Sequence, residues 1–256
     1  MNLEQQVKHL DKHYRDGNAL VSDKEFDILE KQLLAINPDS DYFTNRNALP
    51  LPSLEKDPIE DFIDDLQLDT LIMIEPKLDG CAIAIEYING RLHHAITRTG
   101  TDVTDKIQNI QNVPDVIKTK DTIQVRGELY APQQTGAMSQ GKSGGYLRAK
   151  AGDPTGLSFC AFQIINADTD HYDTLDYLKR LGFQIPSFSL SELRFLESYR
   201  QMWIKDKIFS DKYPVDGIVV KIVSRQIQLD RPDSVSYTHL RAHETKANLV
   251  CRLLLE

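Results

Sequence analysis

Two kinds of hydrophobic periodicity divide the chain. Near the N-terminus, Ser22-Asp23-Lys24-Glu25 is a capping box, a motif whose side chains pair with free backbone amides at a helix start. The apolar residues after it recur at helical spacing and predict one buried stripe: Phe26, Leu29, Leu33 and Ile36. Asp57-Pro58-Ile59-Glu60 predicts another helix, because proline is favoured at the first helical position, and its apolar stripe ends at Leu66.

From about Thr70 the apolar residues follow the two-residue period of strands. The dipeptide Asn89-Gly90 between apolar runs is a strong hairpin signal, joining a strand that starts at Cys81 to one that ends at Arg98. Other strands are predicted at Leu71–Ile74, Ile123–Tyr130, Leu157–Ile165 and Val215–Ile222. Two helices are predicted before the last strand: Thr174–Leu181, and one opened by the capping box Ser189-Leu190-Ser191-Glu192 and ending near Ile208. Hairpin-connected strands with interspersed helices predict an α+β domain of antiparallel sheets rather than a parallel Rossmann sheet.

Length and composition set limits on the class of protein. The 256 residues correspond to one or two domains, and 30 basic against 38 acidic residues give a net charge of −8. No apolar stretch is long enough to span a membrane, and the N-terminus lacks the basic and apolar regions of a secretory signal. The three cysteines are widely separated, which provides neither a disulfide framework nor a four-cysteine zinc site. We therefore expect a cytoplasmic protein, and the acidic balance disfavours a free-standing basic DNA-binding module.

Two lysines in strand segments are candidates for chemistry. Lys77 precedes the tight turn Asp79-Gly80, so its amine projects from a strand end, and Lys221 ends the run Asp216-Gly217-Ile218-Val219-Val220-Lys221. A lysine amine is a nucleophile only when neutral, so neighbouring cations or burial must lower its pKa from about 10.4. Arg126-Gly127-Glu128 places a carboxylate in another strand. Taken singly, each feature is more simply a surface residue or an ordinary turn.

The order of these motifs along the chain is more specific than any one of them. Four segments resemble, in sequence order, the nucleotidyltransferase motifs of covalent DNA ligases: Glu75–Gly80, Thr97-Arg98, Val125–Glu128 and Asp216–Lys221. Flanking segments resemble the NAD-dependent bacterial branch of that family: Ser22–Leu29, Leu51–Leu54 and Tyr177–Phe183. The resemblance extends over about residues 5–230 and implies an adenylation (nucleotidyltransferase) domain of antiparallel sheets with flanking helices, preceded by a small helical segment.

The resemblance implies a reaction. Lys77 would attack the α-phosphorus of NAD, expel nicotinamide mononucleotide and hold AMP in a phosphoramide bond, and Asp79 would help to position the lysine and the metal-bound nucleotide. Mg²⁺ is expected because phosphoryl transfer usually requires a metal to neutralise charge, and AMP would then pass to a 5′-phosphate at a DNA nick. The other matched residues would bind the nucleotide: Glu75 beside the adenine, Arg98 and Glu128 at the ribose and phosphate region, and Lys221 at the α-phosphate.

The N-terminal helix carries an independent clue to the nucleotide. Asp23 and Asp27 are four residues apart and share one helix face, where their carboxylates repel each other. By themselves they are most simply a solvated surface. The nicotinamide ring of NAD is a cation, which two carboxylates and Tyr14 would suit, and the corresponding positions of the family bind the nicotinamide mononucleotide half. The resemblance also places Ser53 and Leu54 at the cofactor site, whereas Phe26 stands where the family usually has tyrosine.

We predict three segments along the chain. Residues 1–45 form the helical nicotinamide-binding segment, residues 46–233 the adenylation domain, and residues 234–256 a non-native tail. The codons that can encode most of this tail resemble a sequencing adapter, and a genuine amphipathic terminal helix is the alternative. We accordingly reject a metal site at His239 and His243, and assign no metal-binding residue.

Several departures from the family pattern bear on activity. Only Thr99-Gly100-Thr101 stands where a longer glycine-rich loop is usual, and nothing after Asp230 resembles the last adenylation motif with its phosphate-contacting lysine. The barrel, zinc-finger, helix-hairpin-helix and C-terminal repeat domains of these ligases are missing too. We therefore expect a truncated, monomeric protein that contacts nicked double-stranded DNA weakly and seals it poorly. Two alternatives stay open: an ATP-dependent ligase or capping-type nucleotidyltransferase, and a catalytically inactive nucleotide-binding fragment.

Overall fold

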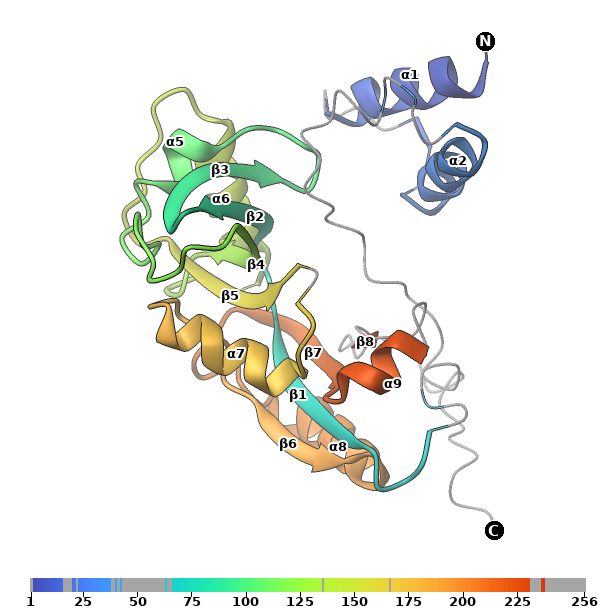
Figure 1. Ribbon diagram of the computed structural model, residues 1–256, viewed down its shortest axis with the longest axis vertical. Helices are drawn as coiled ribbons and strands as arrows, with labels where there is room; N and C mark the ends of the chain where they lie inside the picture. Colours follow the sequence, from blue (N-terminus) through green and yellow to red (C-terminus); the bar gives the residue numbers. More distant parts are fainter. Residues whose placement is uncertain are drawn as a thin grey trace.

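The computed structural model describes residues 2–15, 20–21, 23–37, 40, 42, 63, 66–134, 136–165, 167–230 and 236–237 (Figure 1). The predicted helix at residues 57–66 lies outside the described residues except for Ile63 and Leu66. The predicted tail also lies outside them, except for the backbone of Ser236 and Tyr237. No helix within the described ranges is long and apolar enough to cross a membrane.

The described elements alternate between strands and short helices after an N-terminal pair of helices. The helices are α1 (Leu3–Arg15), α2 (Asp23–Ile36), α5 (Thr104–Ile107), α6 (Gly136–Arg148), α7 (His171–Arg180), the 3₁₀ helix η1 (Leu193–Phe195), α8 (Leu196–Asp206) and α9 (Arg225–Asp230). The strands are β1 (Leu71–Leu78), β2 (Cys81–Ile88), β3 (Arg91–Thr97), β4 (Ile123–Tyr130), β5 (Ser158–Ile164), β6 (Ser189–Glu192), β7 (Val215–Ile222) and β8 (Ser236–Tyr237). The predicted bounds of β4 and β7 are confirmed residue for residue.

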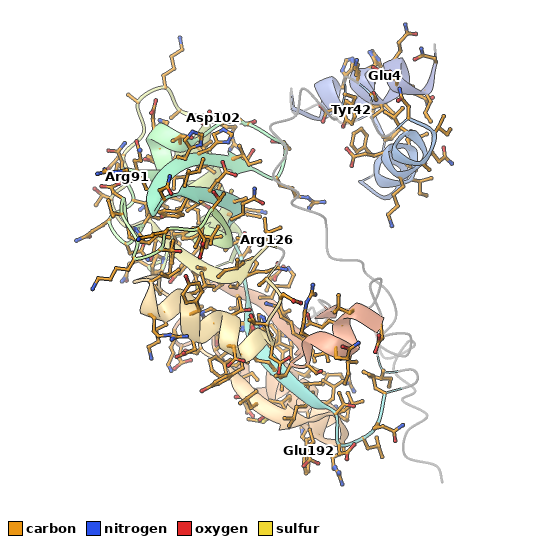
Figure 2. All side chains as sticks on the ribbon, viewed as in Figure 1. Glu4, Tyr42, Arg91, Asp102, Arg126 and Glu192 are labelled. Carbon is orange, nitrogen blue, oxygen red and sulfur yellow. The ribbon has the colours of Figure 1, made fainter. Side chains whose placement is uncertain are left out.

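Helices α1 and α2 share a small apolar cluster. Val7 of α1, Leu33 of α2 and Tyr42 are buried together, and the Tyr42 hydroxyl donates a hydrogen bond to Glu30 Oε1 at 2.9 Å (Figure 2). Phe26 and Leu29 pack against this cluster, as the predicted stripe requires. The prediction is wrong for Ile36, the last residue of α2, which is 75% exposed.

The strands β1 to β8 form two four-stranded antiparallel sheets (Figure 1). The first, sheet A, has the order β6-β1-β7-β8, and the second, sheet B, has the order β3-β2-β4-β5. Every strand pair in both sheets is antiparallel. The predicted α+β class with antiparallel sheets is therefore confirmed.

The predicted hairpin joins β2 to β3. Asn89 and Gly90 have φ values of 50° and 76°, the left-handed backbone that a two-residue hairpin turn of type I′ requires. Glycine is needed at the second position for another reason, because a Cβ on Gly90 would lie 2.4 Å from the carbonyl oxygen of Ile117. The backbone angles thus confirm the predicted Asn-Gly turn, and the nearby Ile117 carbonyl leaves no room for a side chain at Gly90.

The predicted helix start at Ser189 is wrong. Ser189–Glu192 forms β6, which pairs with Leu71–Ile74 of β1, and helical geometry begins only at Leu193. The edge of β1 exposes backbone amides and carbonyls, and pairing with β6 satisfies a row of them, which local capping of a helix cannot do. The helix that follows, α8, ends at Asp206, near the predicted boundary.

Successive side chains of β1 point to opposite faces of sheet A and pack into different core clusters. Ile72 and Ile74 point to one face of sheet A, where they pack with Trp203 of α8. The intervening residue, Met73, belongs to a different core cluster, which contains residues of sheet B and α7. Because strand residues two apart share a face, Glu75 and Lys77 lie on the same side of β1 as Met73, toward sheet B and α7.

Candidate active site

Lys77 reaches an acidic partner across the β1–β7 pair. Lys77 lies opposite Gly217, and the register shifts at the next residue so that Leu78 pairs with Val215 and Asp216 is left over as a bulge. A bulge re-aims the side chain of its extra residue. Lys77 Nζ donates to both carboxylate oxygens of Asp216, at 2.6 and 2.7 Å. The Lys77 side chain is 25% exposed, so it is only partly buried.

Three further ionisable side chains form a buried group, which we call the Glu75 cluster: Glu75 of β1, His171 of α7 and Lys221 of β7. Lys221 Nζ donates to Glu75 Oε2 at 3.0 Å, and His171 Nε2 lies 2.5 Å from Glu75 Oε1. Their side chains are 3%, 7% and 13% exposed for Glu75, His171 and Lys221. Burial by itself would raise the pKa of the Glu75 carboxyl, but Lys221 and His171 outweigh it and lower that pKa to about 2. Glu75 is therefore an ionised carboxylate at neutral pH.

Sheet B contributes Arg126 and Glu128 from β4. These residues are two apart in the strand and share one face, and Glu128 pairs with Cys160 of β5. Burial raises the pKa of Glu128 to about 8. The cations Lys77 and Arg126 oppose this rise, whereas the carboxylates of Asp79 and Asp216 add to it. Glu128 is thus within electrostatic range of Lys77, which places the two sheets on either side of one polar space.

The aromatic ring of Phe162 connects the two sets of cations. Lys221 Nζ lies 5.2 Å and the Arg126 guanidinium 5.9 Å from the centre of this ring, within the range of cation–π attraction. Lys221 Nζ also lies 3.5 Å from the Phe162 carbonyl oxygen. Arg98 acts on the same region, since its charge contributes to lowering the pKa of Arg126.

The structure brings most of the predicted site residues together. Lys221 donates a hydrogen bond to Glu75, the charges of Lys77 and Asp79 both act on the pKa of Glu128, and the charge of Arg98 acts on that of Arg126. Ser53 and Leu54 lie outside the described residues, as do the side chains of Tyr14, Asp23 and Asp27, whose backbones belong to α1 and α2. The functional roles of all these residues stay predictions.

Sequence reasoning missed two residues of the site. Asp216 was part of a recognised motif but was not assigned to the site, and only the bulge in β7 shows that it faces Lys77. His171 had no local signal beyond its place at the start of a helix, where its amide donates to the carbonyl of Val223. Its ring nitrogen meets Glu75 across 96 residues of chain, a distance that no periodicity analysis covers.

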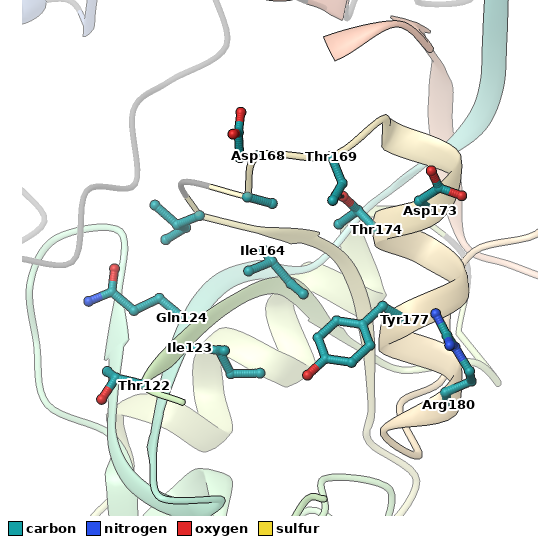
Figure 3. Close-up of a pocket in the computed structure, with 12 residues that line it drawn as sticks. Thr122, Ile123, Gln124, Ile164, Asp168, Thr169, Asp173, Thr174, Tyr177 and Arg180 are labelled. Atoms are coloured by element: carbon teal, nitrogen blue, oxygen red, sulfur yellow. Dashed lines mark hydrogen bonds between the residues drawn. The ribbon is translucent and has the colours of Figure 1, made fainter. Parts of the chain in front are cut away.

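The hollow drawn in Figure 3 is a different feature. It has a volume of about 560 Å³ and lies between the ends of β4 and β5 and the helix α7. Gln124, Thr174, Tyr177 and Arg180 are among its lining residues, and none of the lining residues belongs to the Glu75 cluster or contacts Lys77. We therefore assign the candidate chemistry to the polar space around Lys77.

The donor set near Lys77 suits a partly protein-bound Mg²⁺ ion. No group of three or more His, Cys, Asp or Glu side chains in the described part of the chain is arranged to hold a metal. Mg²⁺ commonly takes only one or two protein carboxylates and completes its shell with water and phosphate oxygens. The carboxylates of Asp79 and Asp216 near Lys77 fit that manner of binding, whereas burial raises the pKa of Glu128 to about 8 and keeps it protonated at neutral pH.

The fold and this arrangement of lysines and carboxylates define a nucleotidyltransferase domain of the ligase type. A solved structure titled "Archaeal ATP-dependent RNA ligase - form 1" superposes with a TM-score of 0.53 at 14% identity, over 75% of this chain and 49% of that one, which shows the fold alone. A family model described as the NAD-dependent DNA ligase adenylation domain matches residues 52–140.

Curated relatives extend the match over more of the chain. Proteins named DNA ligase from Ureaplasma urealyticum and Marinobacter nauticus are 30% and 31% identical over 72% and 71% of this chain. Another, from Endomicrobium trichonymphae, is 26% identical over 87% of it. The chain therefore carries an NAD-dependent DNA ligase adenylation domain, matched at residues 52–140, and is similar to proteins named DNA ligase over most of its length. It spans 32%, 33% and 42% of the lengths of the Ureaplasma, Marinobacter and Endomicrobium proteins.

Proposed function

We propose that the chain carries out the adenylation step of an NAD-dependent DNA ligase, with Lys77 as the nucleophile. The Nζ–P bond forms at the α-phosphorus of NAD, the bond from that phosphorus to the departing nicotinamide mononucleotide breaks, and AMP stays on Lys77. The observation that carries this proposal is the partly exposed Lys77 side chain, whose amine is bonded to Asp216 of β7 and lies within electrostatic range of Glu128 of β4. Asp216 is at hydrogen-bond distance to accept the proton that the amine must lose.

The other ionisable groups complete the proposed site. Lys221 of β7 and Arg98, which directly follows β3, are cations that would offset charge developing on the transferred phosphoryl group. Glu75 would lie beside the adenine. Mg²⁺, held by the Asp79 carboxylate together with phosphate oxygens, would supply further charge neutralisation.

The N-terminal residues 1–45 are proposed to bind the nicotinamide mononucleotide half of NAD through Tyr14, Asp23 and Asp27. Ser53 and Leu54, within the adenylation domain of residues 46–233, are proposed to contribute to the cofactor site. The lysine-bound AMP would then pass to the 5′-phosphate of nicked DNA. The relatives' shared name, DNA ligase, supports this partner.

Intact-mass measurement after incubation with Mg²⁺ and either NAD or ATP tests this function. We expect the mass of one adenylate to be added with NAD, no addition in Lys77→Ala, and a normal addition in Lys118→Ala, which removes an exposed lysine outside the site. Adduct formation from ATP and not from NAD would favour the ATP-dependent class. If neither nucleotide labels the wild-type chain, the inactive nucleotide-binding fragment is the correct reading.

A further inference from the structure

His171 closes a triangle of contacts inside the Glu75 cluster. Its Nε2 lies 2.5 Å from Glu75 Oε1 and 3.2 Å from Lys221 Nζ, while Lys221 donates to the other oxygen of Glu75 at 3.0 Å. A single ring nitrogen cannot both donate to the carboxylate and accept from the ammonium. Because an ionised carboxylate only accepts, and lone pairs of nitrogen and oxygen would repel each other at this distance, the proton belongs on Nε2 and points to Glu75.

The three partners create a conflict when a nucleotide binds. The proposed function requires the Lys221 ammonium to face the α-phosphate, yet Lys221 is bonded to Glu75 in this structure. A buried carboxylate that loses its cation is strongly unfavourable unless another group replaces the lost interaction. His171 is already within hydrogen-bond distance of Glu75 and is held in place by the bond from its amide to the Val223 carbonyl.

We propose that His171 is a positioning residue that keeps the Glu75 carboxylate hydrogen-bonded and charge-balanced while Lys221 turns from Glu75 to the phosphate. This inference rests on the proposed adenylation step and extends it, since it assigns a role to a residue outside the matched motifs. Without His171, Lys221 would be the principal partner of Glu75 and would be retained there.

The charges around His171 determine how it responds when Lys221 leaves. Burial and the Lys221 cation lower the pKa of His171, while Glu75 acts to raise it. Cys160, on β5, stays a neutral thiol because burial raises its pKa, and Asp170, the residue just before α7, accepts a hydrogen bond from the amide of Arg225. Departure of Lys221 therefore leaves Glu75 as the dominant charge on the ring and favours the imidazolium, which balances Glu75.

An NMR titration of the His171 ring tests this response without any assay of activity. In the wild-type chain we expect a pKa below the ordinary value of 6.5, and in Lys221→Met a rise of at least about one unit, because Glu75 remains and the opposing cation is gone. Lys221→Arg keeps the cation and serves as the control, and Lys221→Gln is a second neutral variant should Lys221→Met not fold. A His171 pKa that is the same with and without the cation overturns the proposal.

Adenylation kinetics test the consequence for the reaction. His171→Leu fills the space but cannot donate, so the rate of adduct formation at saturating NAD should fall about tenfold to a hundredfold. His171→Gln keeps a donor and should stay within about threefold of wild type. Thr174→Ala, a buried control on the same helix whose hydroxyl instead bonds the Asp170 carbonyl, should lose stability without a comparable loss of rate.

The outcomes separate the two proposals. Equal loss of rate in His171→Leu and His171→Gln would show a role in packing alone and overturn the positioning role. If the wild-type chain forms no adduct, the proposed adenylation step is contradicted. The NMR titration still tests separately whether His171 balances the charge of Glu75.

Discussion

Replacing Glu75 with glutamine removes the only negative charge of the Glu75 cluster while nearly preserving its shape. Burial would raise the pKa of the Glu75 carboxyl, but Lys221 and His171 lower it from 4.5 to about 2. Each pKa unit corresponds to about 1.36 kcal/mol, so the ionised carboxylate stabilises the folded chain by about 3 kcal/mol at neutral pH. The lowered pKa means that this stabilisation is present above pH 4.5 and is lost as the pH falls through about 2.

The expected result for Glu75→Gln is a free energy of unfolding lower by about 3 kcal/mol at pH 7 and by about half as much at pH 3. Urea unfolding can be followed by the fluorescence of Trp203, the chain's single tryptophan, which is 2% exposed beneath sheet A. The control is Glu192→Gln, which breaks an exposed pair with Arg194 and should cost less than about 1 kcal/mol. A loss in Glu75→Gln no larger than in this control, or one that does not shrink toward acid, would refute the reasoning.

Three further predictions concern the site and its supporting strands. Because burial raises the pKa of Glu128 to about 8, the folded state retains a proton that the unfolded state has lost above about pH 5, so stability falls as the pH rises. In Glu128→Gln this loss in the free energy of unfolding should be smaller by about 1–3 kcal/mol, as measured by urea unfolding at several pH values. Parallel pH profiles for the variant and the wild type would contradict the prediction. Gly127→Ala places a Cβ 2.3 Å from Cζ of Phe159. It should lower the Tm by about 2–10 °C in calorimetry, whereas Gly141→Ala, whose Cβ meets nothing within 4 Å, should not lower it. Burial raises the pKa of the Cys160 thiol, so an alkylating reagent at mildly alkaline pH should modify Cys160 only after the chain unfolds, as detected by peptide mapping. Rapid labelling of Cys160 in the folded chain would contradict this prediction.

Much of sheet B and β7 could be predicted from local patterns, because their strands combine β-branched residues with a two-residue period and clear turn signals. The Asn89-Gly90 turn and the bounds of β4 are examples. The segment Ser189–Glu192 could not be predicted in this way. Its residues suit a helix start, but a strand edge that is distant in sequence offered its backbone more hydrogen bonds.

The sequence by itself determined the candidate chemistry: a lysine ahead of an Asp-Gly turn, a second lysine at the end of another strand, and a family whose motifs match both. Only the tertiary structure decided their partners. Lys77 meets Asp216 across 139 residues of chain, and Glu75 meets His171 across 96. Such pairs depend on the register of β1 against β7, on the bulge at Asp216 and on the packing of α7, and these arise when distant backbone groups pair, which short-range periodicity does not encode.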